Sequence, residues 1–283
     1  MAVDLAPIDE SLLAGIANMH GMPKGAFNIR KDGQLVERHS SAYIDIETKT
    51  DNPGINIYIS AKAQGETVYI PACVTKSGVN DLVYNDFFIE PGADVIIVAG
   101  CGVHTEGEEE SRHNGVHRFF LGKGARALYK EKHIGTGSGT GARRIDPVTD
   151  MTLEEDAYFD MDTLQIGGVT STNRTTNGRL GARAKLVIRE RLLTAGDEIA
   201  ASSFNVSLDG DDSGVDLASR SAARCMSYQE PRSVTKGTCR CTGHSERDAI
   251  PVDHGRVTAQ HALSDGLLDA SLLHDAPHAQ VAG

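Results

Sequence analysis

Hydrophobic and polar positions alternate over short stretches along most of the chain. In the stretch G-I-N-I-Y-I-S, the apolar residues Ile55, Ile57 and Ile59 occupy every second position. A period of two places successive side chains on opposite faces of an extended chain, so each such stretch predicts a β-strand with one buried face. The same pattern predicts strands at Ala42, Ile44 and Ile46, at Val68 and Ile70, at Val83, at Val95–Val98, at Leu164–Ile166, at Ala184, Leu186 and Ile188, and at Phe204, Val206 and Leu208.

The period of a helix is found near the N-terminus. Residues Ile8–Met19 place Leu12, Leu13 and Ile16 on one face, and Asp9 is a suitable capping residue. A charged segment, Asn28–Ser40, follows and is expected at the surface. We therefore divide the chain into an N-terminal helical segment, residues 1–40, and a mainly β core, residues 41–283.

Periodicity alone does not choose among a sandwich, a barrel and a solenoid. Glycine, asparagine and aspartate separate the expected strands, as in P-G-A-D, N-G-R-L-G and D-G-D-D-S-G. Aliphatic side chains that stack in repeated coils, with such residues at the turns, favour a solenoid, although no fixed sequence repeat is present. The glycine-rich run Gly135–Gly141 is not followed by G-K-[ST], so it is expected to be a turn and not a phosphate loop.

Composition limits the classes of function. The chain has 283 residues, enough for a full core, and a formal net charge of −11, which disfavours binding to nucleic acid. Neither a basic patch nor a long apolar run predicts membrane association, and the N-terminus lacks a positively charged leader, so a cytoplasmic location is expected. Five cysteines form no disulfide framework, and Cys73 and Cys101 sit among strand residues as small buried apolar groups.

One stretch, Gly237–Asp248, gathers the side chains that hold zinc or iron. It contains the thiols of Cys239 and Cys241, the imidazole of His244 and two carboxylates. Arg247 lies among them, and its charge repels a cation. The alternative interpretation is a polar turn with structural thiols and a hydrogen-bonded histidine.

A second polar stretch, Gly100–His117, contains Cys101, His104 and His113 together with four glutamates. His113 and His117 would share one face of a strand, two pleats apart and too far apart to chelate a metal alone. The stretch is therefore either part of a metal or sulfur site or a solvated acidic loop that leaves a buried strand.

Several motifs together resemble the SufB/SufD proteins of the SUF iron–sulfur assembly machinery, and most closely a short, archaeal-type SufB-like branch. The resemblance covers about Ile8 to Gly283. It is carried by Y-N-D-F-F-I-E-P-G-A-D-V-I-I-V-A-G-C-G-V-H (Tyr84–His104), N-G-V-H-R-F-F (Asn114–Phe120), D-P-V-T (Asp146–Thr149), S-Y-Q-E (Ser227–Glu230), G-H-S-E-R-D-A-I (Gly243–Ile250) and the closing A-S-L-L-H-D-A-P-H-A-Q-V-A-G.

The resemblance implies a right-handed parallel β-helix (solenoid) core with a short N-terminal helical segment and a truncated C-terminal helical region. It implies a scaffold, not an enzyme, on which a transient iron–sulfur cluster is assembled in the cytoplasm. The implied partners are a SufC-like ABC-type ATPase, a cysteine desulfurase or other sulfur donor, and a second SufB/SufD chain in a homodimer or heterodimer.

The resemblance also implies which residues bind the cluster. Cys241, His244 and Asp275 are the expected metal ligands, with Cys239 and His274 beside them. The sequence departs from the family where Arg247 replaces a cysteine that is thought to accept sulfur, because a guanidinium donates hydrogen bonds and does not ligate metal. Asp275 replaces the glutamate of the closing H-E-A motif, and the terminal helices that help bind the ATPase are shortened.

Two alternatives remain open at this point. The chain is either a scaffold that holds iron and sulfide itself or a SufD-like structural paralogue that binds a SufB-like or ATPase partner without assembling a cluster. A β-helix enzyme acting on polysaccharide is a third and weaker possibility, because a chain without tryptophan and with 5% aromatic residues has few platforms for stacking sugars.

Overall fold

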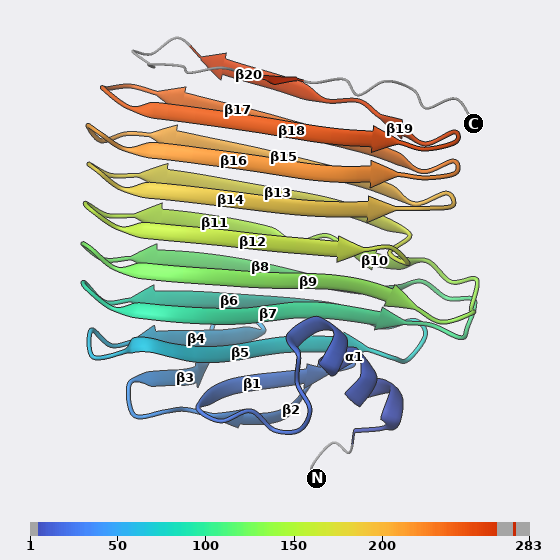
Figure 1. Ribbon diagram of the computed structural model, residues 1–283. Coiled ribbons are helices and arrows are strands. Elements are labelled where there is room, and N and C mark those ends of the chain that lie inside the picture. Colours follow the sequence, from blue (N-terminus) through green and yellow to red (C-terminus); the bar gives the residue numbers. More distant parts are fainter. Residues whose placement is uncertain (1–4, 265–273, 276–283) are drawn as a thin grey trace.

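Each coil of the chain contributes one strand to each of two facing sheets, and the coils stack into a β-solenoid of about seven turns (Figure 1). The computed structural model describes residues 5–264 and 274–275. The stack of coils confirms the predicted solenoid. The expected C-terminal helical region lies outside the described residues, apart from the short strand at 274–275.

The first sheet, sheet A, faces the viewer in Figure 1. Its strands from β5 onward are paired in parallel, with one register shift between Gln64 and Glu66 of β5. In spatial order, sheet A consists of β2 (Gln34–His39), β1 (Ala26–Lys31), β5 (Gln64–Val74), β7 (Asp94–His104), β9 (Arg126–Thr136), β12 (Tyr158–Ile166), β14 (Lys185–Thr194), β16 (Gly214–Ala223), β18 (Thr242–Pro251) and β21 (His274–Asp275).

The second sheet, sheet B, lies behind sheet A in the same view. Its spatial order is β3 (Ile44–Thr48), β4 (Gly54–Ile59), β6 (Asn80–Ile89), β8 (Ser111–Leu121), β10 (Arg143–Ile145), β13 (Ser171–Leu180), β15 (Ile199–Leu208), β17 (Tyr228–Gly237) and β19 (Arg256–Val257), with β11 (Val148–Leu153) also between β8 and β13 and β20 (Gln260–Ser264) also on β17.

The N-terminal end of the solenoid is formed by two antiparallel pairs. β2 runs antiparallel to β1 in sheet A, and β3 runs antiparallel to β4 in sheet B. β1 itself is parallel to β5, and its first four residues are buried. The segment Asn28–Ser40, expected at the surface, therefore supplies most of β1 and all of β2. Residues 26–39 belong to the same sheet as the core that was assigned to residues 41–283.

The helix α1 (Pro7–Ala17) covers the outer face of sheet A near this end (Figure 1). It ends earlier than the predicted Met19, because Asn18 adopts the left-handed conformation with φ 53°. Asp9 lies in the first turn, where its Oδ2 accepts a hydrogen bond from the Ala6 N–H at 2.7 Å. Close approach of the helix requires glycine at Gly100, where a Cβ would lie 2.7 Å from the Cβ of Ile16.

The core lies between the two sheets, where aliphatic and aromatic side chains stack from coil to coil. Phe87 and Phe119 stack in successive strands of sheet B with ring centroids 4.5 Å apart, and Phe119 meets Phe159 of sheet A edge to face. Alternation along strands such as β8 and β12 buries every second side chain, as the period of two predicts.

Small side chains form a ladder inside the tight turns that lead from sheet B into sheet A. Backbone hydrogen bonds join equivalent positions of successive coils, so the residues stack directly on one another. Every member of the ladder is buried. We call this row the turn ladder, and it consists of Ala63, Ala93, Ala125, Ala157, Ala184, Ser213 and Cys241.

The predicted separators agree with the structure in part. P-G-A-D and D-G-D-D-S-G lie at turns before β7 and β16, whereas the first four residues of N-G-R-L-G belong to β13. Gly178 of that stretch faces the interior, where a Cβ would lie 3.1 Å from a Leu186 methyl group. The glycine therefore provides space in the core and does not form a turn.

Candidate functional site

The two residues proposed first as metal ligands lie on opposite sides of the chain. Cys241 precedes β18 and faces the interior with 4% of its surface exposed. His244 lies on the outer face of β18, where its Nδ1 is 2.8 Å from Oδ1 of Asp216 on the neighbouring strand β16. Because adjacent faces of a strand point in opposite directions, the two side chains do not converge on one ion.

Cys241 is the last described member of the turn ladder, a position that alanine occupies in five earlier coils. Its Sγ lies 3.2 Å from the backbone oxygen of Cys239, and burial raises the pKa of the Cys241 thiol. The Sγ of Cys239, which is half-buried, lies 3.5 Å from the backbone oxygen of Leu208. Both thiols are free and contact the hydrophobic core. The location of Cys241 is that of a small core residue.

Arg247 faces the interior of the solenoid and is 6% exposed. In the register of sheet A it lies beside Ser219, and the same interior row continues through Glu190, Thr163 and Glu131. A guanidinium therefore occupies the position that the resemblance assigns to a cluster-binding thiol, and it belongs to a row of buried polar side chains.

The remaining expected ligands, His274 and Asp275, are known here only by backbone register. His274 pairs with Glu246, and Asp275 pairs with Arg247, in the ladder between β18 and β21. Their side chains lie outside the described part of the structure. The strand stack thus brings the two segments together, as expected.

A buried polar cluster that the sequence did not indicate lies at the middle of the solenoid, and we call it the Glu131 cluster. Glu131 Oε1 accepts a hydrogen bond from the Tyr129 hydroxyl at 2.8 Å, and Oε2 accepts one from Arg174 Nη1 at 2.8 Å. His133 Nε2 lies 3.4 Å and His117 Nε2 lies 3.8 Å from Oε1. Three strands supply the cluster: β8 and β13 of sheet B and β9 of sheet A. It consists of His117, Tyr129, Glu131, His133 and Arg174.

The charges of the Glu131 cluster are set by burial and by mutual contact. Burial alone would raise the pKa of Glu131, but the His133 imidazole and the Arg174 guanidinium lower it well below its usual range. Burial lowers the pKa of His117 to about 4, and it also lowers the pKa of His133. The cluster therefore pairs a carboxylate with a guanidinium, beside two imidazoles whose pKa values are lowered by burial.

Next to Arg174, a second carboxylate is held by hydroxyl groups. Glu190 accepts hydrogen bonds from Ser202 at 2.6 Å and from Ser219 at 2.7 Å. These bonds link β14 to β15 of the opposite sheet and to β16 of its own sheet. The two carboxylates and Arg174 therefore form a continuous polar column inside an otherwise apolar core.

The polar stretch Gly100–His117 does not form one site. Cys101 faces the core, where burial raises the pKa of its thiol well above the usual range. His104 lies 2.9 Å from the Thr136 hydroxyl, and His113 lies 2.9 Å from Asp81 Oδ2. Within the described residues, no three side chains of histidine, cysteine, aspartate or glutamate are arranged to hold a metal ion.

Comparison of the chain with models of known protein families and with curated proteins finds no match. The described residues contain no helix that is both long and apolar enough to cross a membrane.

Proposed function

We propose that the chain is a SufD-like structural subunit of a SUF-type assembly complex, which binds a SufB-like chain or a SufC-like ATPase without holding a cluster itself. The motif series resembles the SufB/SufD family, and the β-solenoid fold agrees with what that resemblance implies. Fold agreement alone does not select a function, so the choice between scaffold and structural paralogue rests on the residues at the site.

The observation that carries the proposal is the position of Arg247 inside the solenoid. A cluster-binding residue at this place would need a thiolate, whereas a guanidinium is cationic at every physiological pH and has no lone pair to donate to iron. Arg247 is 6% exposed and lies in the interior row with Ser219 and Glu190. Its placement supports a structural role for this position.

The surroundings of Cys241 support the same choice. Direct scaffolding needs an accessible thiolate near other ligands. Cys241 is buried in the turn ladder, its thiol has a raised pKa, and His244 points away from it and contacts Asp216. Iron and sulfide would be cargo of the partner in this proposal.

Co-expression with a tagged SufB-like chain and a SufC-like ATPase tests the proposal. A stable complex that survives purification in a chelating buffer is the expected result. A matched variant, Arg247→Lys, keeps the charge and should bind the partner equally well if it folds, which circular dichroism checks.

A second experiment, anaerobic reconstitution of the isolated chain with iron, sulfide and reductant, tests whether the chain holds a cluster itself. We expect the same absence of cluster absorption for the wild type and for Cys241→Ala. Cluster absorption in the wild type that disappears in Cys241→Ala would favour direct scaffolding instead. Failure of the chain to bind either partner would overturn the proposed function.

A further inference from the structure

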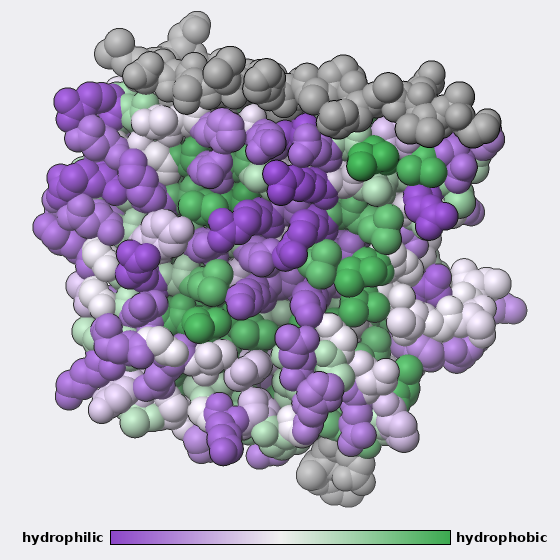
Figure 2. Space-filling view, viewed as in Figure 1, coloured by the Kyte–Doolittle hydropathy of each residue, from purple (hydrophilic) through white to green (hydrophobic). Residues whose placement is uncertain are grey.

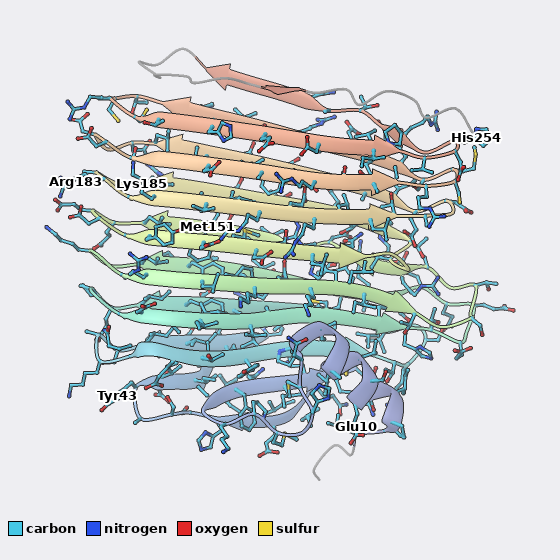
Figure 3. All side chains as sticks on the ribbon, viewed as in Figure 1. Glu10, Tyr43, Met151, Arg183, Lys185 and His254 are labelled. Carbon is cyan, nitrogen blue, oxygen red and sulfur yellow. The ribbon has the colours of Figure 1, made fainter. Side chains whose placement is uncertain are left out.

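An open groove of about 540 Å³ lies on the outer face of sheet B, beside the tight turns at the N-terminal end of the solenoid. Tyr43, at its edge, is labelled at the lower left of Figure 3. The lining of the groove comes from the first coils of the solenoid, whereas Arg247 lies in β18, in one of the last coils. It is lined by residues of β3, β4, β6 and β8 and by the turns that follow β4, β6, β8 and β11.

Three aromatic rings form the floor of this groove. Tyr58, Phe88 and Phe120 occupy equivalent outward positions in β4, β6 and β8. Their centroids are 5.1 Å apart between Tyr58 and Phe88 and 5.2 Å apart between Phe88 and Phe120, with nearly parallel planes. Tyr58 and Phe120 are each 40% exposed. In a chain with few aromatic residues, an outward stack of three is an apolar surface that the core does not require.

Carboxylates form the rim of the groove. Glu90 follows Phe88 by two residues, and Glu154 follows Thr152, the neighbour of Phe120 in β11, by two residues. One coil, which carries Gly122, separates the two glutamates. Two strand spacings correspond to about 10 Å between their backbones. Gly122 between them lies against Pro91, whose Cδ would be 2.8 Å from a Cβ at this position. Backbone N–H groups bind each side chain: Ala61 N–H donates to Glu90 at 2.8 Å, and Lys123 N–H donates to Glu154 at 3.1 Å.

The charge of the groove has one sign. Its described lining contains Asp45, Glu90 and Glu154 and no lysine, arginine or histidine. Two cations on neighbouring positions are held by other acids: Arg118 binds Asp86 at 2.8 Å, and Lys123 binds Glu155 at 2.8 Å. A ligand with positive charge would therefore meet carboxylates without having to displace a cation from the lining.

We propose that this groove binds an extended basic segment of a partner protein. The aliphatic stems of lysine or arginine lie over the aromatic edges, and the charged ends reach Glu90 and Glu154 on either side of Gly122. The open shape suits a surface segment more than an enclosed small molecule. This inference does not depend on the proposed function, which rests on Arg247 and Cys241, because neither residue lines the groove.

A carbohydrate is a poorer match for the same surface. Sugars stack on exposed ring faces, whereas both faces of Phe88 are covered by its neighbours Tyr58 and Phe120. The rings present their edges to the groove, which favours aliphatic stems over flat sugar rings. Carbohydrate binding is therefore an outcome that the test must distinguish.

The test is a calorimetric titration of the full chain with the peptide acetyl-Lys-Leu-Lys-Leu-Lys-amide, compared with the same peptide containing glutamate in place of lysine. The double variant Glu90→Gln/Glu154→Gln should bind the basic peptide at least tenfold more weakly, and Phe120→Ser should also weaken it. The control variant Asp197→Asn/Asp253→Asn removes two exposed carboxylates remote from the groove and changes the net charge equally. It should bind the peptide like the wild type.

Three results would overturn the inference. Equal weakening in the groove variant and in the control variant would mean that only net charge attracts the peptide. Unchanged binding in the groove variant would place the peptide elsewhere. Binding of maltohexaose that is lost in Phe120→Ser, with no binding of the basic peptide by the wild type, would assign the surface to carbohydrate. Circular dichroism of every variant verifies that the solenoid is retained.

Discussion

Arg174 of sheet B donates a hydrogen bond from Nη1 to Oε2 of Glu131 of sheet A at 2.8 Å, so one charge-assisted bond joins the two sheets inside the solenoid. Removing one partner leaves the other charge buried without it. We expect Glu131→Gln or Arg174→Met to lower the free energy of unfolding by about 3–5 kcal/mol. Chemical denaturation followed by circular dichroism measures this loss.

The double variant Glu131→Gln/Arg174→Met is the control for this pair. It removes both charges together, so it should lose less stability than the sum of the two single losses. Strict additivity of the two losses would contradict a direct coupling between Glu131 and Arg174.

Buried His117 makes stability depend on pH. Its pKa is about 4 in the folded chain, against an ordinary value of 6.5, so the unfolded chain takes up a proton between these values while the folded chain does not. The free energy of unfolding should therefore fall by about 3 kcal/mol from this residue as the pH decreases from 6.5 to 4. Denaturation curves at several pH values in this range measure the fall.

Glu131 acts in the same direction at lower pH. Its pKa is held well below the usual range, so its contribution to the free energy of unfolding is present above the ordinary pKa of a glutamate and is lost as the pH falls below that value.

The variant His117→Gln should flatten the pH dependence of the free energy of unfolding between pH 6.5 and pH 4 compared with the wild type. An unchanged slope in this variant would show that His117 does not titrate as described.

Cys241 should tolerate alanine and not a larger side chain. Alanine fills the same place of the turn ladder in five earlier coils, so Cys241→Ala should change the free energy of unfolding by no more than about 1 kcal/mol. Cys241→Leu adds volume to a packed turn and should cost about 1–3 kcal/mol. Thermal unfolding of both variants provides the comparison, and a large loss in Cys241→Ala would indicate a role beyond packing.

Cys225 occupies a left-handed turn position that an earlier coil fills with glycine. Its φ is 60°, as is that of Gly196, which lies beside it in the stack of turns. Side chains other than glycine are strained there, so Cys225→Gly should raise the free energy of unfolding by about 0.5–1 kcal/mol.

Cys225→Ser serves as the matched control, because it removes the exposed thiol but keeps the Cβ and the backbone strain. It should unfold like the wild type. Equal stabilisation by serine and by glycine would assign the effect to the thiol and not to the backbone.

The sequence predicted the strands whose buried positions carry aliphatic side chains. β4 and β7 were recognised in this way, because their inward residues are isoleucine, valine and alanine. β8 and β13 were obscured, because their inward positions include His113 and His117 in the first and Arg174 in the second. A polar residue at a buried position breaks the alternation of apolar and polar residues from which a strand is predicted.

The candidate site was predicted less well than the fold. Adjacency in sequence suggested that Cys241 and His244 act together, but an odd separation along an extended chain directs them to opposite faces. The Glu131 cluster could not be found from adjacency either, because Arg174 reaches Glu131 from the facing sheet. The sequence does contain one signal for this cluster. In A-L-Y-K-E-K-H, Glu131 and His133 occupy alternate positions after Tyr129 and therefore share its face of the strand.

The antiparallel pairs make the N-terminal end of the stack different from the coils that follow it. A further coil of the same kind would have to pair in parallel with both β2 and β3, yet each of these strands already runs opposite to its neighbour. The uniform parallel ladder of the coils therefore does not continue past β1 and β4 at this end. Within the described residues, antiparallel pairs occur only at this end, so β2 and β3 cap the parallel stack.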